Sequence, residues 1–310
     1  MMTKAAVLGA SGGMGYSLVH ELIAKGYEVT AFARNQSKME RLFKGKQVKI
    51  LTGDAYEEED VLKACEKADI IFHTVSVPYP DWDKGHPAIM RHALTAAAHE
   101  KAKLVIIDNI YAYGKQNGKK VKENAQKSPH TRKGRIRLSM EKMAMESGVP
   151  YMVLHFPDYY GPNAENTLLH QTLKPASEYK RAIYIGSLTL PREFIYTPDG
   201  AKAAVNLAEA DHAYGQNWNI PGAGTIRGKD IIQIIRSETG KPASVMKIGK
   251  GAIWVMGWFD RNMREMGEMM YLNEEPVILS GEKYESAIGP LPATSYDEGI
   301  RATLAYMRKE

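Results

Sequence analysis

Cysteine and long apolar runs are the scarcest features of this 310-residue sequence. Its single cysteine, Cys65, excludes an internal disulfide and indicates a reducing compartment, which we interpret as the cytoplasm. Cys65 lies in a charged stretch with a helical pattern, Glu57–Ala68, so we expect an inert thiol rather than a nucleophile. No apolar run approaches the roughly 20 residues of a membrane span. The first run, Ala5–Leu8, is also too short for the core of a signal peptide. We therefore expect a cytoplasmic protein with no membrane partner.

Metal-ligand spacings are missing as well. The nine histidines show no His-x-x-x-His pair and no Cys–His spacing, so we expect no metal site. A Gly-x-Ser-x-Gly nucleophile elbow is also absent.

Positive charge is concentrated in one segment. The net charge is +5, yet Lys115–Arg137 alone holds nine Lys or Arg and one acidic residue, which leaves the rest of the chain slightly acidic. No basic helix carries interleaved aromatic residues, so we do not expect a nucleic-acid partner. Two interpretations stay open for the segment: a solvated loop, or a positive rim beside a site for anions.

Apolar runs alternate with helical patterns over the first half of the chain, which predicts parallel strands joined by crossover helices in a doubly wound α/β sheet. Helices are expected at Pro87–His99 and Met140–Ser147, among others. The expected strands are Ala5–Leu8, Glu28–Ala33, Val48–Leu51, Ile70–Val75, Lys103–Ile107, Pro150–Phe156 and, further on, Gln216–Ile220.

The regular alternation of strand and helix patterns ends after Gly161-Pro162, which predicts a second, discontinuous domain. We assign residues 1–162 and about 181–220 to a dinucleotide-binding domain, and about 163–180 with 221–310 to a smaller α+β cap. A small-molecule substrate is expected in the cleft between them. The Met-rich segment Met256–Met270 is interpreted as core or interface, with an adaptable apolar pocket as the alternative. Monomer and homodimer both stay open.

The strongest motif is Gly9-Ala10-Ser11-Gly12-Gly13-Met14-Gly15, because it follows a strand and opens a helix. Gly9 would make the tight turn, Gly12 would let the backbone approach a pyrophosphate, and Gly15 would let the helix pack on the strand. The free N–H groups of the helix then face the phosphates. We therefore expect the whole loop to bind a dinucleotide.

The end of the second strand indicates which dinucleotide is preferred. It carries Arg34-Asn35, with Lys38 one turn later and no acid before Glu40. A guanidinium is a good partner for the 2′-phosphate of NADP, and the Ser11 hydroxyl can add to it. We predict NADP; in the alternative interpretation Arg34 is an ordinary surface charge and NAD is used.

These residues resemble the extended short-chain dehydrogenases, the family of NAD-dependent sugar epimerases and dehydratases. The resemblance rests on the glycine spacing, on Gly53-Asp54, and on Tyr113-Gly114 and Tyr160-Gly161-Pro162, and it runs over nearly the whole chain. It implies a Rossmann-type doubly wound sheet with a C-terminal cap and substrate between them. It also implies that Asp54 binds the adenine amine and that Thr74 and Val75 contact the cofactor.

The catalytic set of that family does not carry over. Asn109 stands where members have Ser or Thr, four residues before Tyr113. Their Tyr-x-x-x-Lys pair is replaced by Lys133 and Arg137, in a register set by the following small residue and by Glu141. Arg137 can hold ribose hydroxyls or a phosphate but cannot exchange a proton at neutral pH. Lys133 is a candidate base only if its pKa is strongly depressed.

The loss of the family's tyrosine leaves other proton donors to consider, and the motif that binds substrate in the family is also changed. Tyr111, Tyr113 and Tyr160 are the alternative donors. His155-Phe156-Pro157-Asp158 replaces the family's Arg-x-x-Asn, whose Asn helps to bind a substrate diphosphate. An anionic Asp158 would repel that phosphate, whereas Phe156 and Pro157 can still line the nicotinamide with backbone groups.

Two functions follow. The first is an NAD(P)-dependent oxidoreductase or epimerase/dehydratase-like enzyme with a non-standard proton donor. The second is a non-catalytic NADP(H)-sensing regulatory protein. The complete cap favours the enzyme, because a sensor has less need of a substrate cleft.

Overall fold

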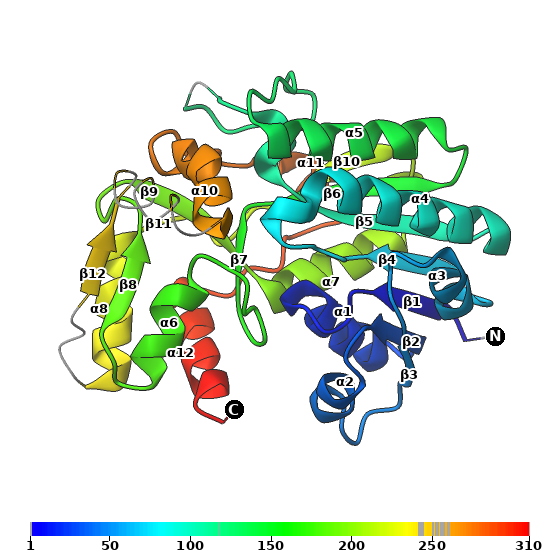
Figure 1. Ribbon diagram of the computed structural model, residues 1–310, viewed down its shortest axis with the longest axis horizontal. Helices are drawn as coiled ribbons and strands as arrows, with labels where there is room; N and C mark the ends of the chain where they lie inside the picture. Colours follow the sequence, from blue (N-terminus) through cyan, green and yellow to red (C-terminus); the bar gives the residue numbers. More distant parts are fainter. Residues whose placement is uncertain are drawn as a thin grey trace.

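Seven parallel strands form the central sheet of the computed structural model, in the order β3-β2-β1-β4-β5-β6-β10 (Figure 1). The structure describes residues 2–116, 118–240, 245–249, 251, 254, 258 and 261–309, with 261–263 described by their backbone only. The strands are β1 Lys4–Leu8, β2 Glu28–Ala33, β3 Lys49–Thr52, β4 Ile70–His73, β5 Lys103–Asn109, β6 Tyr151–Phe156 and β10 Gln216–Asn219. All seven expected strands are therefore present.

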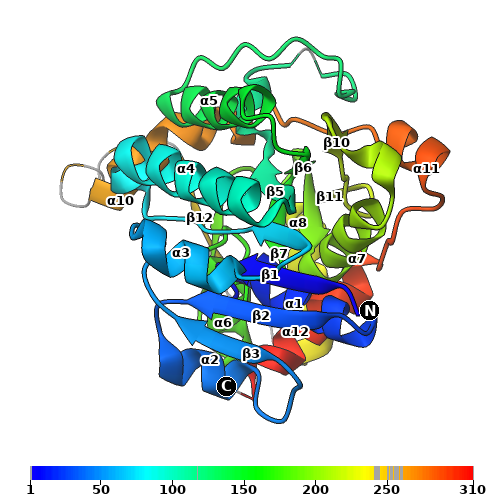
Figure 2. The same cartoon turned by 90° about the vertical axis from the view of Figure 1, so that its right-hand side faces the viewer.

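Helices cover both faces of this sheet, because the strand side chains on each face are apolar and must be shielded from water. One face carries α3 Glu58–Cys65, α4 Trp82–Glu100 and α5 Arg132–Glu146 (Figure 2). The other face carries α1 Gly13–Ala24 and α7 Thr197–Ala208, which pack against each other. The short helix α2 Gln36–Leu42 follows β2, and the 3-10 turns are η1 Tyr79–Asp81, η2 Ile110–Tyr113 and η3 Asp211–Ala213.

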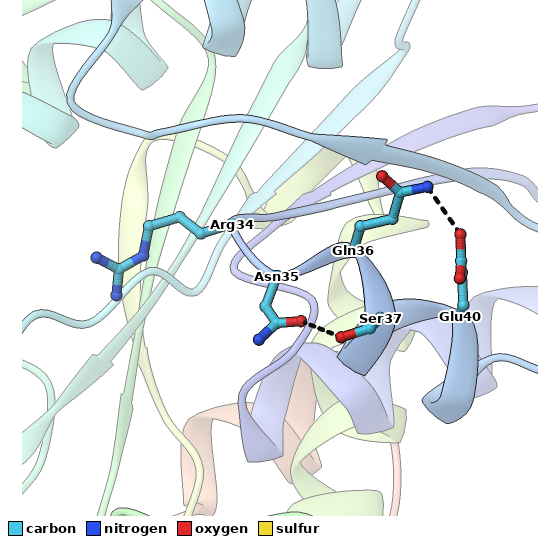
Figure 3. A pocket seen from close by; sticks show the side chains of 5 residues that line it. All are labelled: Arg34, Asn35, Gln36, Ser37 and Glu40. Carbon is cyan, nitrogen blue, oxygen red and sulfur yellow. Dashed lines mark hydrogen bonds between the residues drawn. The ribbon is translucent and has the colours of Figure 1, made fainter.

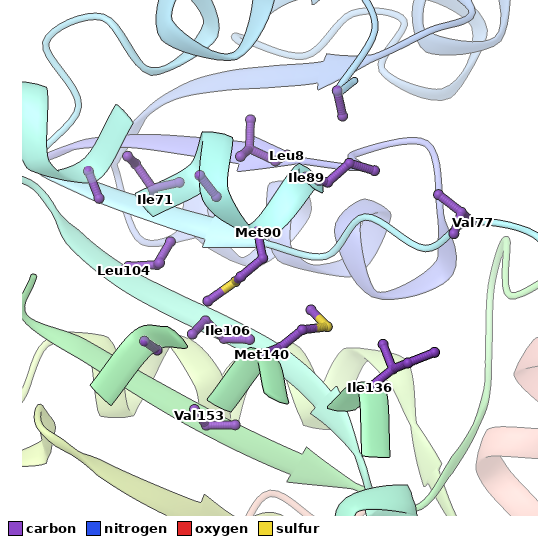
Figure 4. Close-up of a cluster of buried hydrophobic side chains, with 14 of the residues drawn as sticks. Leu8, Ile71, Val77, Ile89, Met90, Leu104, Ile106, Ile136, Met140 and Val153 are labelled. Atoms are coloured by element: carbon purple, nitrogen blue, oxygen red, sulfur yellow. The ribbon is translucent and has the colours of Figure 1, made fainter. Parts of the chain in front are cut away.

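The core beneath α4 and α5 shows how the layers interlock (Figure 4). Met90 of α4 and Met140 of α5 are at most 1 % exposed and lie over strand residues Leu8, Leu104 and Ile106. Each such side chain contributes roughly 1.5–3 kcal/mol by leaving water. This core fixes the strand ends from which the site residues project.

The second, smaller body contains a three-stranded sheet and a two-stranded sheet. The first is β11-β9-β7, with β7 Asp158–Tyr160, β9 Pro191–Tyr196 and β11 Thr225–Arg227. The second pairs β8 Ala182–Ile185 with β12 Val245–Ile248. Two further elements, η4 Glu268–Asn273 and α11 Glu282–Ala287, bury side chains in the cores of the large sheet, and α10 Arg261–Gly267 precedes η4. The helices of the smaller body are α6 His170–Ser177, α8 Gly228–Thr239 and α12 Tyr296–Met307. A core of Tyr184, Phe194, Ile231 and Ile300 holds most of these elements together.

The observed strand pairing differs from the expected boundary between the dinucleotide domain and the cap. Residues 181–196, which we assigned to the dinucleotide domain, form β8 and β9 and pair with strands of the cap. The chain returns to the large sheet only with α7 and β10. Tyr284 of α11, inside the expected cap, is instead buried in the core under α1 and α7. Neither difference could be read from the periodicity of the sequence, because both depend on contacts between segments that are far apart in the chain.

Two smaller expectations concern the rest of the chain. Met269 and Met270 are buried, as expected for core, while part of the Met-rich segment, including Met256, lies outside the described residues. None of the helices that the structure describes is both long enough and apolar enough to cross a membrane.

Glu193 of β9 gives the fold a testable pH dependence. Its side chain is 5 % exposed and Oε2 accepts a hydrogen bond from the Leu279 amide at 3.0 Å. Burial raises the pKa of Glu193 to about 7, against the lowering effect of backbone amides and Lys120. A carboxyl with a raised folded-state pKa stabilises the fold fully below its unfolded pKa. That stability is lost as pH rises through the folded value.

We therefore expect the stability of wild type relative to Glu193→Gln to fall by about 2–3 kcal/mol between pH 5 and pH 8. Urea denaturation of both proteins at the two pH values measures it, and other titrating groups cancel in the difference. A stability difference that does not change with pH would refute the assignment.

Candidate cofactor and active site

The loop between β1 and α1 has positions at which only glycine fits, among them Gly9 and Gly15. Gly9 has φ +90°, and a Cβ added there would lie 2.8 Å from Thr74 Oγ1. A Cβ at Gly15 would lie 2.3 Å from the Gly9 carbonyl oxygen. At Gly12, by contrast, a Cβ would meet only the Gly9 oxygen, at 3.5 Å. Gly12 therefore borders open space, while Gly9 and Gly15 hold the loop against the sheet.

The amino end of α1 offers unpaired amides to that space. The helix has no side-chain cap, and its first bond runs from the Tyr16 amide to the Gly12 oxygen at 2.7 Å. The amides of Gly13, Met14 and Gly15 precede that bond and have no partner within the helix. Three such N–H groups with the positive end of the helix dipole suit a pyrophosphate. The residues present thus fit the group that the motif implies.

The segment after Tyr160-Gly161-Pro162 folds over this loop. Asn163 Nδ2 donates to the Ser11 carbonyl oxygen at 3.0 Å, and a Cβ on Gly13 would lie 2.8 Å from the Ala164 Cα. Next to them, Lys38 Nζ is paired with Glu165 at 2.7 Å. Lys38 is thus engaged by a carboxylate, which differs from our expectation that it faces a 2′-phosphate.

Arg34 lies in an open hollow at the end of β2, with Asn35, Gln36, Ser37 and Glu40 (Figure 3). Asn35 Oδ1 accepts hydrogen bonds from the Lys38 amide and the Ser37 hydroxyl, each at 2.9 Å, and so caps α2. The exposed Arg34 side chain points away from Gln36 and Glu40 (Figure 3). Among the described residues it makes no ion pair. The guanidinium is therefore available for an anion.

Asp54 and Thr74 lie where the neighbouring strands end. Asp54 follows β3, and its Oδ1 accepts from the Tyr56 amide at 3.1 Å. Thr74 follows β4, and its hydroxyl donates to the Leu8 oxygen at 2.8 Å, with Val75 next in the chain. Both side chains thus support the carboxyl edge of the sheet, which is where ligands bind in folds of this type.

Asn109 and Tyr111 stand together at the carboxyl end of β5. Asn109 Oδ1 accepts from the Tyr111 amide at 3.0 Å and starts the turn η2. Asn109 can still donate from Nδ2, but an amide does not exchange protons at neutral pH. The Tyr111 side chain is 8 % exposed, and its hydroxyl lies 3.2 Å from the hydroxyl of Tyr79.

The other two tyrosine candidates are packing residues. Tyr113 is fully buried and donates to Asn219 Oδ1 at 2.7 Å, and burial raises its pKa far above the ordinary value. Tyr160 is 1 % exposed and packs on Tyr296 and Gly299. Both side chains are buried and the Tyr113 hydroxyl already has a partner, so the geometry does not support either as a proton donor.

Lys133, in the place of the family's tyrosine, is also buried and fully paired. Its side chain is 0 % exposed, and Nζ lies 2.7 Å from Glu265 Oε2 and 3.2 Å from Glu268 Oε1. A third bond goes to the Glu265 carbonyl oxygen at 2.9 Å. These three acceptors occupy the ammonium group and leave it no access to solvent. The expectation that Lys133 exchanges a proton with substrate is therefore not supported by this geometry.

Arg137, in the place of the family's lysine, belongs to a buried polar cluster. Its Nε lies 3.3 Å from Asp108 Oδ1, its Nη2 lies 3.4 Å from His86 Nε2, and its Cζ lies 4.5 Å from the Trp82 ring centroid. Burial, aided by Arg137, lowers the pKa of His73 to about 3 and holds that of His86 well below its usual range. The guanidinium is therefore a fixed cation among neutral histidines and one carboxyl.

Asp158 does not stand alone either. It forms an ion pair with Arg192 of β9, and both are largely buried. Burial raises the pKa of Asp158, and Arg192 opposes that shift. The pair is close to neutral, so the argument that Asp158 would repel a substrate phosphate does not hold in this structure. Phe156 is buried, and its strand leads into the adjoining Pro157 beside this pair.

The basic segment is largely neutralised by carboxylates. Six of its nine basic side chains have an acidic partner, as Lys127 has in Glu141 at 2.6 Å. Lys127 also contacts the buried His155, at 2.9 Å. Lys119 and Lys120 are exposed, as in a solvated loop, whereas half of these pairs tie buried or partly buried side chains together.

The family model of the NAD dependent epimerase/dehydratase family matches residues 5–221, and the chain belongs to this family. It is a family of enzymes, named for its NAD-dependent epimerases and dehydratases. No curated protein matches the sequence.

Solved structures share the fold over the whole chain. UDP-glucuronic acid 4-epimerase from Bacillus cereus, in complex with NAD, is 20% identical, with 99% of each chain covered and a TM-score of 0.81. dTDP-glucose 4,6-dehydratase from Bacillus anthracis, also with NAD, is 15% identical, with 99% of this chain and 97% of that chain covered and a TM-score of 0.81. UDP-glucose 4-epimerase from Thermotoga maritima, with UDP-glucose, is 18% identical, with 99% of each chain covered and a TM-score of 0.78. The expected fold is confirmed.

Sequence reasoning missed the residues that surround the expected ones. Tyr79 was not selected, although Tyr79-Pro80-Asp81-Trp82 follows the fourth strand and so reaches the same sheet edge as Asn109. Glu265 and Glu268 gave no signal, because their partner Lys133 lies more than 130 positions earlier in the chain.

Proposed function

We propose that this chain is an NAD(P)-dependent oxidoreductase or epimerase/dehydratase-like enzyme that acts on a hydroxyl or carbonyl group of a small molecule, sugar-type substrates included. The observation that carries the proposal is the β1–α1 loop, where glycine is sterically required at Gly9 and Gly15 and open space adjoins Gly12. Family membership over residues 5–221 supports it.

The residues that would hold the cofactor lie along the carboxyl edge of the sheet. The amides of Gly13, Met14 and Gly15 suit the pyrophosphate, and Arg34, Asn35 and Asp54 suit the adenosine end. Asn109, Arg137, Phe156 and Pro157 with Thr74 and Val75 suit the nicotinamide end. A bound nicotinamide supplies or accepts a hydride. The protein then has to supply orientation and a proton.

For the form of the cofactor we propose NADP. The Bacillus cereus epimerase and the Bacillus anthracis dehydratase named above were determined with NAD, and that cofactor is compatible with the same loop. At the end of β2, however, this chain places an exposed arginine without an ion pair among the described residues, and no acid lies between Arg34 and Glu40. An arginine favours a 2′-phosphate, whereas an acid would repel it.

Exchange of Arg34 for Asp is expected to reverse the cofactor preference. A charge-assisted contact contributes roughly 1.5–3 kcal/mol, so wild type should bind NADP about tenfold to a hundredfold more tightly than NAD. Calorimetric Kd values for both cofactors, at low and high salt, measure the ratio. Lys38→Ala is the control and should leave the ratio unchanged, because Lys38 is paired with Glu165. Equal Kd values for both cofactors in wild type would reject the NADP assignment.

Activity is tested by the oxidation of NADPH across a panel of carbonyl compounds that includes oxidised sugar nucleotides. We expect at least one class of carbonyl to accelerate oxidation in wild type and not in Gly12→Val.

A non-catalytic NADP(H) sensor is the second candidate, and the sealed Lys133 favours it. The place where relatives of this fold have their catalytic tyrosine is closed by Glu265 and Glu268. A sensor would bind NADPH with unchanged affinity in the presence of every carbonyl tested and would oxidise none of it.

A further inference from the structure

Two tyrosine hydroxyls meet at the sheet edge where the proposed reaction takes place. Tyr79 is in η1, after β4, and Tyr111 is in η2, after β5; these strands are parallel neighbours, so both turns lie at the same edge. The hydroxyls are 3.2 Å apart. The Trp82 ring lies beside both, with centroids 5.3 Å from Tyr79 and 6.1 Å from Tyr111. Tyr79 is the more exposed of the two.

The groups around Tyr79 shift its pKa in opposite directions. Lys133 Nζ lies 4.9 Å from the centre of the Tyr79 ring. Burial raises the pKa of Tyr79, as do Asp158 and Glu268, while the hydrogen bond with Tyr111 and the charge of Arg137 lower it. Burial raises the pKa of Tyr111 well above its ordinary value. Tyr111 therefore keeps its proton and can donate a hydrogen bond to an ionised Tyr79.

Resting on the function proposed above, we propose that Tyr79 replaces the missing tyrosine as the proton donor in carbonyl reduction, with Tyr111 and Lys133 as its positioning residues. The reduced nicotinamide supplies the hydride. The C=O π bond of the substrate breaks, its carbon gains the hydride, and its oxygen takes the Oη proton of Tyr79. The phenolate that is left accepts a hydrogen bond from Tyr111, lies beside the Lys133 ammonium, and is reprotonated from water.

Lys133 thereby acts on Tyr79 without touching the substrate. Its three acceptors hold the ammonium in place, and the cation over the ring stabilises the phenolate. In this proposal the position of the family's tyrosine, Lys133 on α5, supplies a cation, and the proton donor lies instead in η1.

Single-turnover oxidation of bound NADPH tests the proposal. Tyr79→Phe should slow it by about 10²–10⁴-fold, the usual contribution of an acid catalyst, and leave the calorimetric Kd for NADPH unchanged. Tyr111→Phe should slow it by about tenfold and move the alkaline limb of the pH–rate profile upward, because the phenolate loses a hydrogen bond. The exposed Tyr179→Phe is the control and should match wild type.

A titration that needs no substrate tests the same pair. With the tyrosine Cζ atoms labelled by ¹³C, the Tyr79 resonance is identified by its loss in Tyr79→Phe. Its pKa should rise by roughly one unit in Tyr111→Phe.

The outcomes separate the two proposals. Failure of wild type to bind NADPH would overturn the proposed function. Unchanged turnover in Tyr79→Phe, or an unchanged Tyr79 pKa in Tyr111→Phe, would overturn the present inference while the cofactor assignment stands.

Discussion

Lys133→Met is expected to destabilise the protein by about 2–4 kcal/mol, the largest loss of stability among the variants considered. Lys133 is fully buried and holds two carboxylates together, those of Glu265 and Glu268, which are 18% and 31% exposed. Removing one partner of a buried ion pair costs about 3–5 kcal/mol, because the remaining charge is left without compensation. The partial exposure of the carboxylates reduces that figure.

Urea denaturation measures this effect as a lower midpoint with an unchanged slope. Lys119→Met is the matched control, because Lys119 is exposed and makes no ion pair in the part of the chain that the structure describes. Adding Glu265→Gln to Lys133→Met should restore part of the loss, because one of the two like charges is removed. A midpoint equal to that of wild type would show that the ion pair is not formed.

Gly12→Val is expected to abolish dinucleotide binding while the protein stays folded, the largest loss of affinity. Gly12 is exposed, and a Cβ there would meet only the Gly9 oxygen, at 3.5 Å, so we expect the fold to accept the substitution. The space beside Gly12 is also where a pyrophosphate would approach the amides of α1. The valine therefore competes with the ligand rather than with the core. Calorimetry should show a Kd for NADP at least a hundredfold weaker than that of wild type.

Gly15→Val separates this effect from simple misfolding. Its Cβ would lie 2.3 Å from the Gly9 oxygen, so this variant should lose stability as well as binding. If Gly12→Val binds NADP with the affinity of wild type, the assignment of the loop is wrong.

Most of the large sheet could be predicted from the sequence, because its signals are local. Each buried strand is a short apolar run, and Gly9 and Gly15 stand where the chain must turn tightly and pack closely. The cap could be predicted only in outline. Its strands β8 and β9 pair with β12 and β11, which lie more than 30 residues further along the chain, and no periodicity encodes such pairing.

The site divides in the same way. The loop residues that we propose to bind the cofactor through their backbone follow from the motif, because glycine spacing dictates their geometry. The roles of Lys133, Lys38 and Asp158 could not be predicted, because each side chain forms an ion pair with a residue on a distant element. Their partners are Glu268, Glu165 and Arg192, respectively. Residue type alone suggested a base, a phosphate ligand and a repulsive charge, and the partners change all three interpretations.

Hydrogen–deuterium exchange of wild type with and without NADP tests the central claim most directly, because it locates the cofactor. If the β1–α1 loop holds the pyrophosphate, exchange should slow at the amides of Gly13, Met14 and Gly15, and also around Arg34. Distant elements such as α8 should be unaffected. Saturating NADP that leaves the exchange of residues 9–15 unchanged, or that protects only another surface, would contradict the account.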